Sequence, residues 1–116
     1  MLQNVRAAVA YIAGRMISDS QSSHVYDYSQ GRYISISGNV DELSVGVYDY
    51  TNGAHISGTG RSLYHYGTGR HISLSVSNGN FSGYDYDSSS HFSGSVSGNS
   101  VSLYDYGEGR YFSYSV

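Results

Sequence analysis

The chain contains no cysteine, no proline and no lysine. The absence of cysteine excludes disulfides and thiolate metal sites, and it leaves the redox compartment open. The absence of lysine leaves six arginines against nine acidic residues, for a formal net charge of -3. Because nucleic-acid binding needs a basic face, this balance argues against nucleic acid as a partner.

Long apolar runs are also absent. No stretch reaches the ~18 consecutive apolar residues of a spanning helix, so we expect no membrane span. Within residues 1–18, apolar residues recur at three- and four-residue steps: Leu2, Val5, Val9, Ile12 and Met16. This spacing predicts one N-terminal amphipathic helix, packed on its own sheet or on another subunit. The polar residues 18–23 then form a linker.

Tyrosine is abundant, with 14 of the 116 residues. From His24 onward the pattern changes to period two, which indicates strands. A Tyr-x-Tyr phrase recurs five times along this part of the chain. Its first tyrosines are Tyr26, Tyr48, Tyr64, Tyr84 and Tyr104. A period of about twenty residues indicates a repeat architecture.

Each repeat has the pattern of a β-hairpin. A turn with glycine or serine in its third position follows every Tyr-x-Tyr phrase, and a second set of turns at 37–39, 58–60, 77–80 and 97–99 joins the repeats. The fold class is therefore all-β, an antiparallel meander that is either barrel-like or two-layered. The domains are 1–23, helix and linker, and 24–116, a single hairpin-repeat unit. The expected strands are 24–28, 32–37, 43–50, 54–58, 61–66, 70–76, 81–86, 91–96, 100–106 and 110–116.

Two hairpin registers are compatible with these turns. A three-residue loop with a G1 bulge uses the glycine in a left-handed conformation, and we favour it. It places Tyr26 and Tyr28 on the core face with Ile34, and it sets Asp27 opposite Tyr33. A four-residue loop would instead place the tyrosines beside the serines. The choice matters because a slip of one residue moves every side chain to the other face.

In the favoured register, carboxylates and imidazoles meet across neighbouring strands. These ligand types suit Zn²⁺ or another divalent metal, and the alternative is a repeated cross-strand polar pair without a ligand. No cofactor is predicted beyond this possible metal. The candidate metal ligands are the pairs Asp49 and His55, Asp85 and His91, and His65 and His71.

The tyrosines offer a second kind of site. Tyrosine-rich, serine-rich surfaces are typical of adaptable binding sites, and the alternative is that these rings fill the core. The candidate residues for stacking on a small ligand or glycan are Tyr48, Tyr50, Tyr64, Tyr66, Tyr84 and Tyr86. No Gly-x-Ser-x-Gly elbow occurs, and the Gly-rich turns open strands rather than helices. We therefore predict no catalytic residues and no enzyme.

The phrases "VYDYSQG", "VYDYTNG", "GYDYDSS" and "LYDYGEG" resemble those of the four-fold beta-flower proteins over about residues 24–116. The resemblance implies a small bacterial protein of repeated hairpins with no established activity, and no functional residue carries over from it. We expect a cytoplasmic protein, with export left open. An apolar sheet face and open strand edges need cover, so we expect a homo-oligomer that acts by self-assembly or partner binding.

Overall fold

The computed structural model describes residues 1–116, with one helix, α1 (Gln3–Ser18), followed by ten strands. Every expected strand is present, and each end agrees with the expectation to within three residues. The strands are β1 (His24–Asp27), β2 (Arg32–Val40), β3 (Val45–Asp49), β4 (Ala54–Gly58), β5 (Ser62–His65), β6 (Arg70–Ser77), β7 (Asn80–Asp85), β8 (Ser90–Ser97), β9 (Ser100–Asp105) and β10 (Arg110–Ser115).

The strands close into a barrel in which each strand pairs antiparallel with its neighbours in sequence. The closing pair is β1 with β10, where Tyr26 lies opposite Ser115 and Asp27 opposite Tyr114. Of the two predicted layouts, the barrel is the one observed. Closure leaves the sheet without a free edge, so one of the two reasons for expecting an oligomer is gone.

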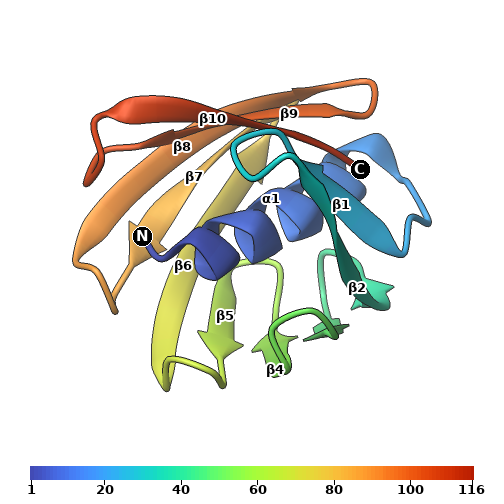
Figure 1. Ribbon diagram of the computed structural model, residues 1–116. Coiled ribbons are helices and arrows are strands. Elements are labelled where there is room, and N and C mark those ends of the chain that lie inside the picture. Colours follow the sequence, from blue (N-terminus) through green and yellow to red (C-terminus); the bar gives the residue numbers. More distant parts are fainter.

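The helix runs through the inside of the barrel, with strands on both sides of it in Figure 1. Every residue from Val5 to Arg15 is buried, including those opposite the predicted apolar stripe. The stripe was thus only part of the buried surface, because strands surround α1 on all sides. Its small alanines let it fit this interior, and helix and strands share one core cluster of 25 residues.

The structure has no helix of the length and hydropathy needed to span a membrane.

The favoured hairpin register was wrong, and the four-residue loop is the one observed. Val25 pairs with Ile34, Tyr26 with Tyr33 and Asp27 with Arg32, so residues 28–31 form the loop. Gly31 has a φ of +65°. This conformation is needed by both loop types, so the glycine could not choose between them. Val25, Asp27 and Ile34 consequently face the core, and the tyrosines face outward.

The turns at the opposite end of the barrel are partly as expected. Two-residue turns join β6 to β7 at Asn78 and Gly79, and β8 to β9 at Gly98 and Asn99. The turn expected at 37–39 is instead part of β2, which continues to Val40 before turning at 41–44.

Candidate functional site

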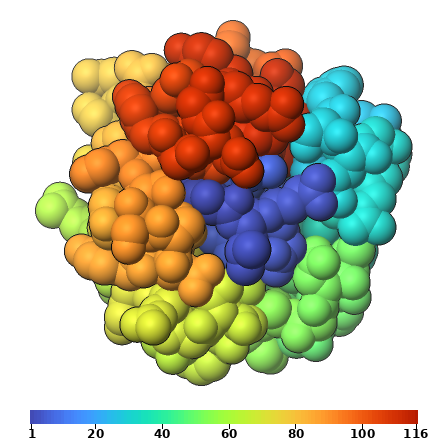
Figure 2. Space-filling view, turned by 60° about the vertical axis from the view of Figure 1, so that its left-hand side comes forward, coloured from blue at the N-terminus to red at the C-terminus, as the bar shows by residue number.

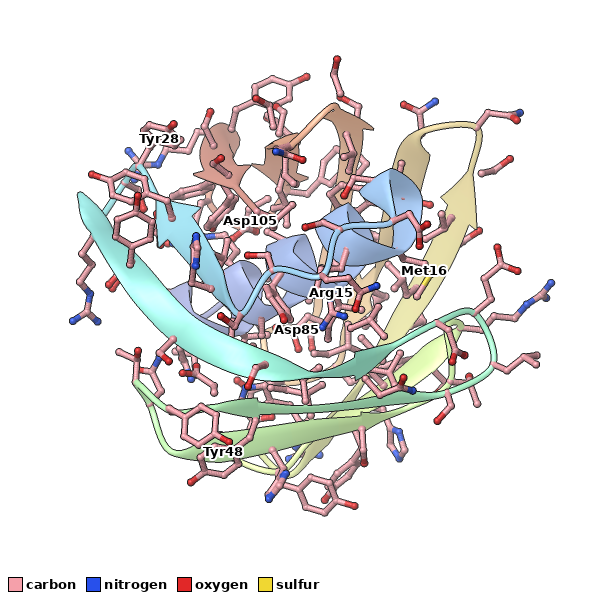
Figure 3. The ribbon with its side chains drawn as sticks, turned by 90° about the vertical axis from the view of Figure 1, so that its right-hand side faces the viewer. Arg15, Met16, Tyr28, Tyr48, Asp85 and Asp105 are labelled. Atoms are coloured by element: carbon pink, nitrogen blue, oxygen red, sulfur yellow. The ribbon has the colours of Figure 1, made fainter.

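Each Tyr-x-Tyr phrase divides its three side chains between the two faces of the barrel wall. Successive residues of a strand point to opposite faces, so the middle residue enters the barrel while its two tyrosines leave it. Figure 3 shows Tyr28 and Tyr48 pointing away from the strands, whereas Asp85 and Asp105 lie within the barrel. The phrase therefore builds two different surfaces, one inside and one outside.

The inner surface is a set of five buried polar side chains, here called the inner ring. All five have 0% exposure, and each stands where a strand enters its four-residue hairpin loop. In Asp49, one carboxylate oxygen accepts the backbone N–H of Asn52 at 2.9 Å and the other accepts its side-chain amide at 2.8 Å. Such bonds fix the turn. The inner ring consists of Asp27, Asp49, His65, Asp85 and Asp105.

The inner ring meets the N-terminal end of α1, which Figure 2 shows enclosed by the hairpins. Arg6 Nη1 donates to Asp105 Oδ2 at 3.1 Å, and the Met1 amine lies 3.2 Å from the same oxygen. Burial acts to raise the pKa of Asp105. The Met1 amine, the Gly107 N–H and Arg6 outweigh burial and lower this pKa. This carboxylate therefore anchors the helix within the barrel.

His65 is the one member of the inner ring that is not a carboxylate. Its Nδ1 accepts the backbone N–H groups of Gly67 at 3.1 Å and Thr68 at 3.3 Å. The Nδ1 lone pair is thereby occupied, so the neutral ring carries its proton on Nε2. Burial lowers the pKa of His65, against the opposing charges of Asp49 and Asp85. This arrangement suits a turn-closing acceptor. Nε2 carries the proton and is buried without a hydrogen-bond partner, so neither nitrogen offers a lone pair to a metal.

The candidate metal ligands are distributed over opposite faces. His55, His71 and His91 are exposed on the outside, whereas their predicted partners Asp49, His65 and Asp85 belong to the inner ring. The three predicted pairs were therefore wrong, for the same reason as the register. No group of three or more ligand-type side chains is placed to hold a metal ion.

The outer surface is a belt of aromatic rings around the same end of the barrel, here called the outer belt. In each hairpin the first tyrosine is half-buried, the second is exposed, and a tyrosine or histidine lies across from the first. Within each set the ring centroids lie 4.5 to 4.9 Å apart, edge to face. The outer belt comprises Tyr26, Tyr28, Tyr33, Tyr48, Tyr50, His55, Tyr64, Tyr66, His71, Tyr84, Tyr86, His91, Tyr104, Tyr106 and Tyr111. All six predicted ligand-stacking tyrosines belong to it.

Hydrogen bonds connect the outer belt from one hairpin to the next. The backbone N–H of Tyr106 donates to the His91 carbonyl at 3.1 Å, and its hydroxyl lies 3.3 Å from Ser93 Oγ on the neighbouring hairpin. Ser57 and Tyr66 repeat the hydroxyl contact at 3.5 Å. The exposed rings are thus held against the barrel wall.

The outer face is hollowed in more than one place. One depression of about 530 Å³ lies beside Tyr28, and the largest hollow lies over β6 to β9. A depression of about 710 Å³ runs between Tyr84, His91 and Tyr106, and a second of about 480 Å³ adjoins it. The two share the lining residues Ser75, Ser82 and Ser93, and together they are called the outer groove. It is the largest concave feature of the surface. Of its lining residues, only two were predicted as site residues: Tyr84 for ligand stacking and His91 as a metal ligand.

Two glycines, Gly83 and Gly94, line the outer groove at points where the backbone leaves no room for a side chain. A Cβ on Gly83 would lie 1.9 Å from the Ser73 carbonyl oxygen, and one on Gly94 would lie 2.1 Å from that of Ser102. Neighbouring strands can come this close only because no side chain intervenes. A signal existed in the sequence, since Gly83 precedes its phrase where Val25 and the other repeats carry an aliphatic residue.

A scan against protein-family models found no match, and neither the curated proteins nor the solved structures contain one. The similarity to the four-fold beta-flower proteins therefore stays an interpretation of the sequence.

Proposed function

We propose that this chain is a non-enzymatic binding protein, with the barrel as scaffold and the outer belt as the surface that contacts a small ligand or a glycan. The observation that carries this proposal is the outward direction of the tyrosines. The second tyrosine of each phrase keeps between 56% and 63% of its surface exposed. Tyrosines that filled a core would be unable to contact a ligand.

The chemistry of the outer belt supports this function. A tyrosine ring presents an apolar face and a polar hydroxyl, and it has few rotamers to lose on binding. The edge-to-face contacts within each hairpin restrict these rings further before any ligand arrives. Such preorganisation lowers the entropic cost of association.

Self-assembly is the weaker proposal. It depended on open strand edges and on an uncovered apolar sheet face, whereas the strands form a closed order and the helix occupies the interior. Binding through the outer belt needs neither feature.

A glycan array combined with a thermal-shift screen of small ligands tests the proposal. One variant replaces the second tyrosine of every phrase, Tyr28, Tyr50, Tyr66, Tyr86 and Tyr106, with serine. The control variant replaces Leu43, which is 87% exposed in the turn between β2 and β3, with serine. We expect hits for the wild-type protein and Leu43→Ser, and none for the belt variant. The absence of any hit for the wild type contradicts the proposal. A wild-type oligomer that the belt substitutions dissociate, seen by light scattering, favours self-assembly instead.

A further inference from the structure

The outer groove differs from the rest of the outer belt in charge and in shape. No carboxylate and no guanidinium lines either of its two halves. A smaller hollow near the opposite end of the barrel, by contrast, is lined by residues that include Glu42 and Arg61. An anion in the outer groove would lose hydration without gaining a positive partner, which costs free energy. The occupant that fits is therefore uncharged.

The two ends of the outer groove differ in chemistry. Tyr84, His91 and Tyr106 gather at one end, with the Tyr84 and His91 rings 4.7 Å apart. The other end is lined by hydroxyls from several adjacent strands, including Ser95 and Ser102. The hydroxyls of these two serines make no hydrogen bond within the protein, so they can donate to and accept from a ligand.

A ligand that satisfies both ends has apolar faces for the rings and many hydroxyls for the serines. Sugars have this combination, since C–H groups and hydroxyl groups alternate around a pyranose ring. The two halves, about 710 and about 480 Å³, each lie within the range of sites that hold a drug-sized ligand, ~300–1,000 Å³. Together they suit a chain of sugars better than a single ring.

We infer that the outer groove binds a neutral oligosaccharide, with one sugar against Tyr84 and Tyr106 and the chain continuing over the serines of β6 to β9. This inference rests on the proposed function, because it takes the outer belt to be a binding surface. To that function it adds three statements: the ligand binds in the outer groove, it carries no charge, and it is longer than a single sugar.

The chain offers a closely matched pair of variants. Ser93 and Ser57 occupy the same position of their repeats, are both half-buried, and both lie near the hydroxyl of a belt tyrosine. Only Ser93 lines the outer groove. Ser93→Arg therefore fills the groove, while Ser57→Arg places the same side chain on another hairpin. Tyr106→Ala and Tyr50→Ala form a second pair, since Tyr50 is equally exposed but lies outside the groove.

The experiment titrates ¹⁵N-labelled protein with neutral, sulfated and uronic-acid oligosaccharides and with the neutral monosaccharides. We expect shifts concentrated in β6 to β9 with the neutral oligosaccharides, and weaker binding of the monosaccharides. Ser93→Arg should abolish binding, and Tyr106→Ala should weaken it about three- to tenfold, the usual worth of one aromatic contact. Ser57→Arg should bind as the wild type does, and Tyr50→Ala should lose less affinity than Tyr106→Ala.

The outcomes separate this inference from the proposed function. Chemical-shift changes spread evenly over all five hairpins would contradict binding in the outer groove, and so would equal losses of affinity in both members of a variant pair. Either result would still support the outer belt as a binding surface. A preference for sulfated or uronic-acid oligosaccharides would contradict the inference that the ligand is uncharged. If the chemical shifts of β6 to β9 change with protein concentration when no sugar is present, a second copy of the chain occupies the groove. That result would contradict the proposal that an oligosaccharide binds there. No binding of any sugar or small ligand overturns both proposals.

Discussion

The inner ring and the outer belt are neighbours in sequence and differ in almost every physical respect. The middle residue of each phrase is fully buried, whereas the tyrosine that follows it is more than half exposed. Asp105 holds the turn and α1 through hydrogen bonds, and Tyr106 beside it contacts mainly other side chains of the surface. The difference indicates that the middle residue of the repeated phrase specifies the fold, while its tyrosines form the surface that we propose to bind a ligand. Substitutions should therefore cost stability on the inside and affinity on the outside.

The largest effect is expected from Asp105→Ala. The substitution leaves the guanidinium of Arg6 buried without its carboxylate, and breaking a buried ion pair in this way costs ~3–5 kcal/mol. The control is Asp41→Ala, because Asp41 makes similar hydrogen bonds to the N–H groups of Leu43 and Ser44 on the exposed surface. Urea denaturation should show a large loss for Asp105→Ala and a much smaller one for Asp41→Ala. Equal losses would mean that burial does not set the importance of the inner ring.

A second large effect is expected from an added methyl group at Gly83. Its Cβ would meet the backbone oxygen of Ser73 at 1.9 Å and the ring of Phe92 at 2.6 Å, and overpacking of this kind costs ~1–3 kcal/mol. The control is Gly46→Ala, since a Cβ at the exposed Gly46 meets nothing within 4 Å. Thermal unfolding should give a lower Tm for Gly83→Ala and an unchanged Tm for Gly46→Ala. An unchanged Tm for Gly83→Ala would contradict the close approach of the strands at this position.

The third effect is a pH dependence from His65. Burial lowers its pKa from 6.5 in the folded protein, so the unfolded chain binds more protons just below that pH. The contribution of neutral His65 to the free energy of unfolding should be fully present above pH 6.5. It should be lost as the pH drops through the folded-state pKa. Protonation of Nδ1 would also break the bonds from Gly67 and Thr68.

The measurement compares Tm between about pH 7 and pH 5, where histidines titrate and most carboxylates do not. His65→Gln should flatten the profile in this range. His71→Gln, on the exposed side of the same hairpin, should keep the wild-type profile. If His71→Gln also flattened the profile, the effect would not come from burial.

The positions of the strands could be predicted from the sequence, because period-two patterns and turn residues are local signals. The register could not, because Gly31 and its equivalents fit both loop types. One clue pointed to the observed register. Val25 directly precedes Tyr26, so its apolar side chain lies on the face opposite the tyrosines, which is the face expected to be buried. Ser89, with a φ of +54°, also shows that the left-handed position tolerates another residue.

The position of the helix and the existence of the outer groove could not be predicted from the sequence, because both depend on how the whole chain folds. Ala7, Ala8, Ala10 and Ala13 lie on several sides of α1, which is compatible with burial all round, but only barrel closure places strands there. The outer groove lies over four strands, β6 to β9, and its lining residues come from different repeats. Among the candidate site residues, the tyrosines face outward rather than toward the core as the favoured register predicted, and their role in stacking stays a prediction. The predicted Asp and His pairs were wrong because the register was wrong.

The smallest effect on stability is expected from the outer belt. Tyr66→Ser removes a ring that is 60% exposed. This ring makes a close edge-to-face contact with Tyr64, at 4.8 Å, and a more distant one with His55, at 6.4 Å. Such a contact is worth about 0.5–1.5 kcal/mol, and exposure places the loss at the low end of this range. The matched change Leu63→Ser, on the buried side of the same strand, should cost several times more, because it buries a hydroxyl and leaves a cavity. Urea denaturation of the two variants measures the ratio directly. Comparable losses would assign the exposed tyrosines to the fold, and the belt would then need no ligand to explain it.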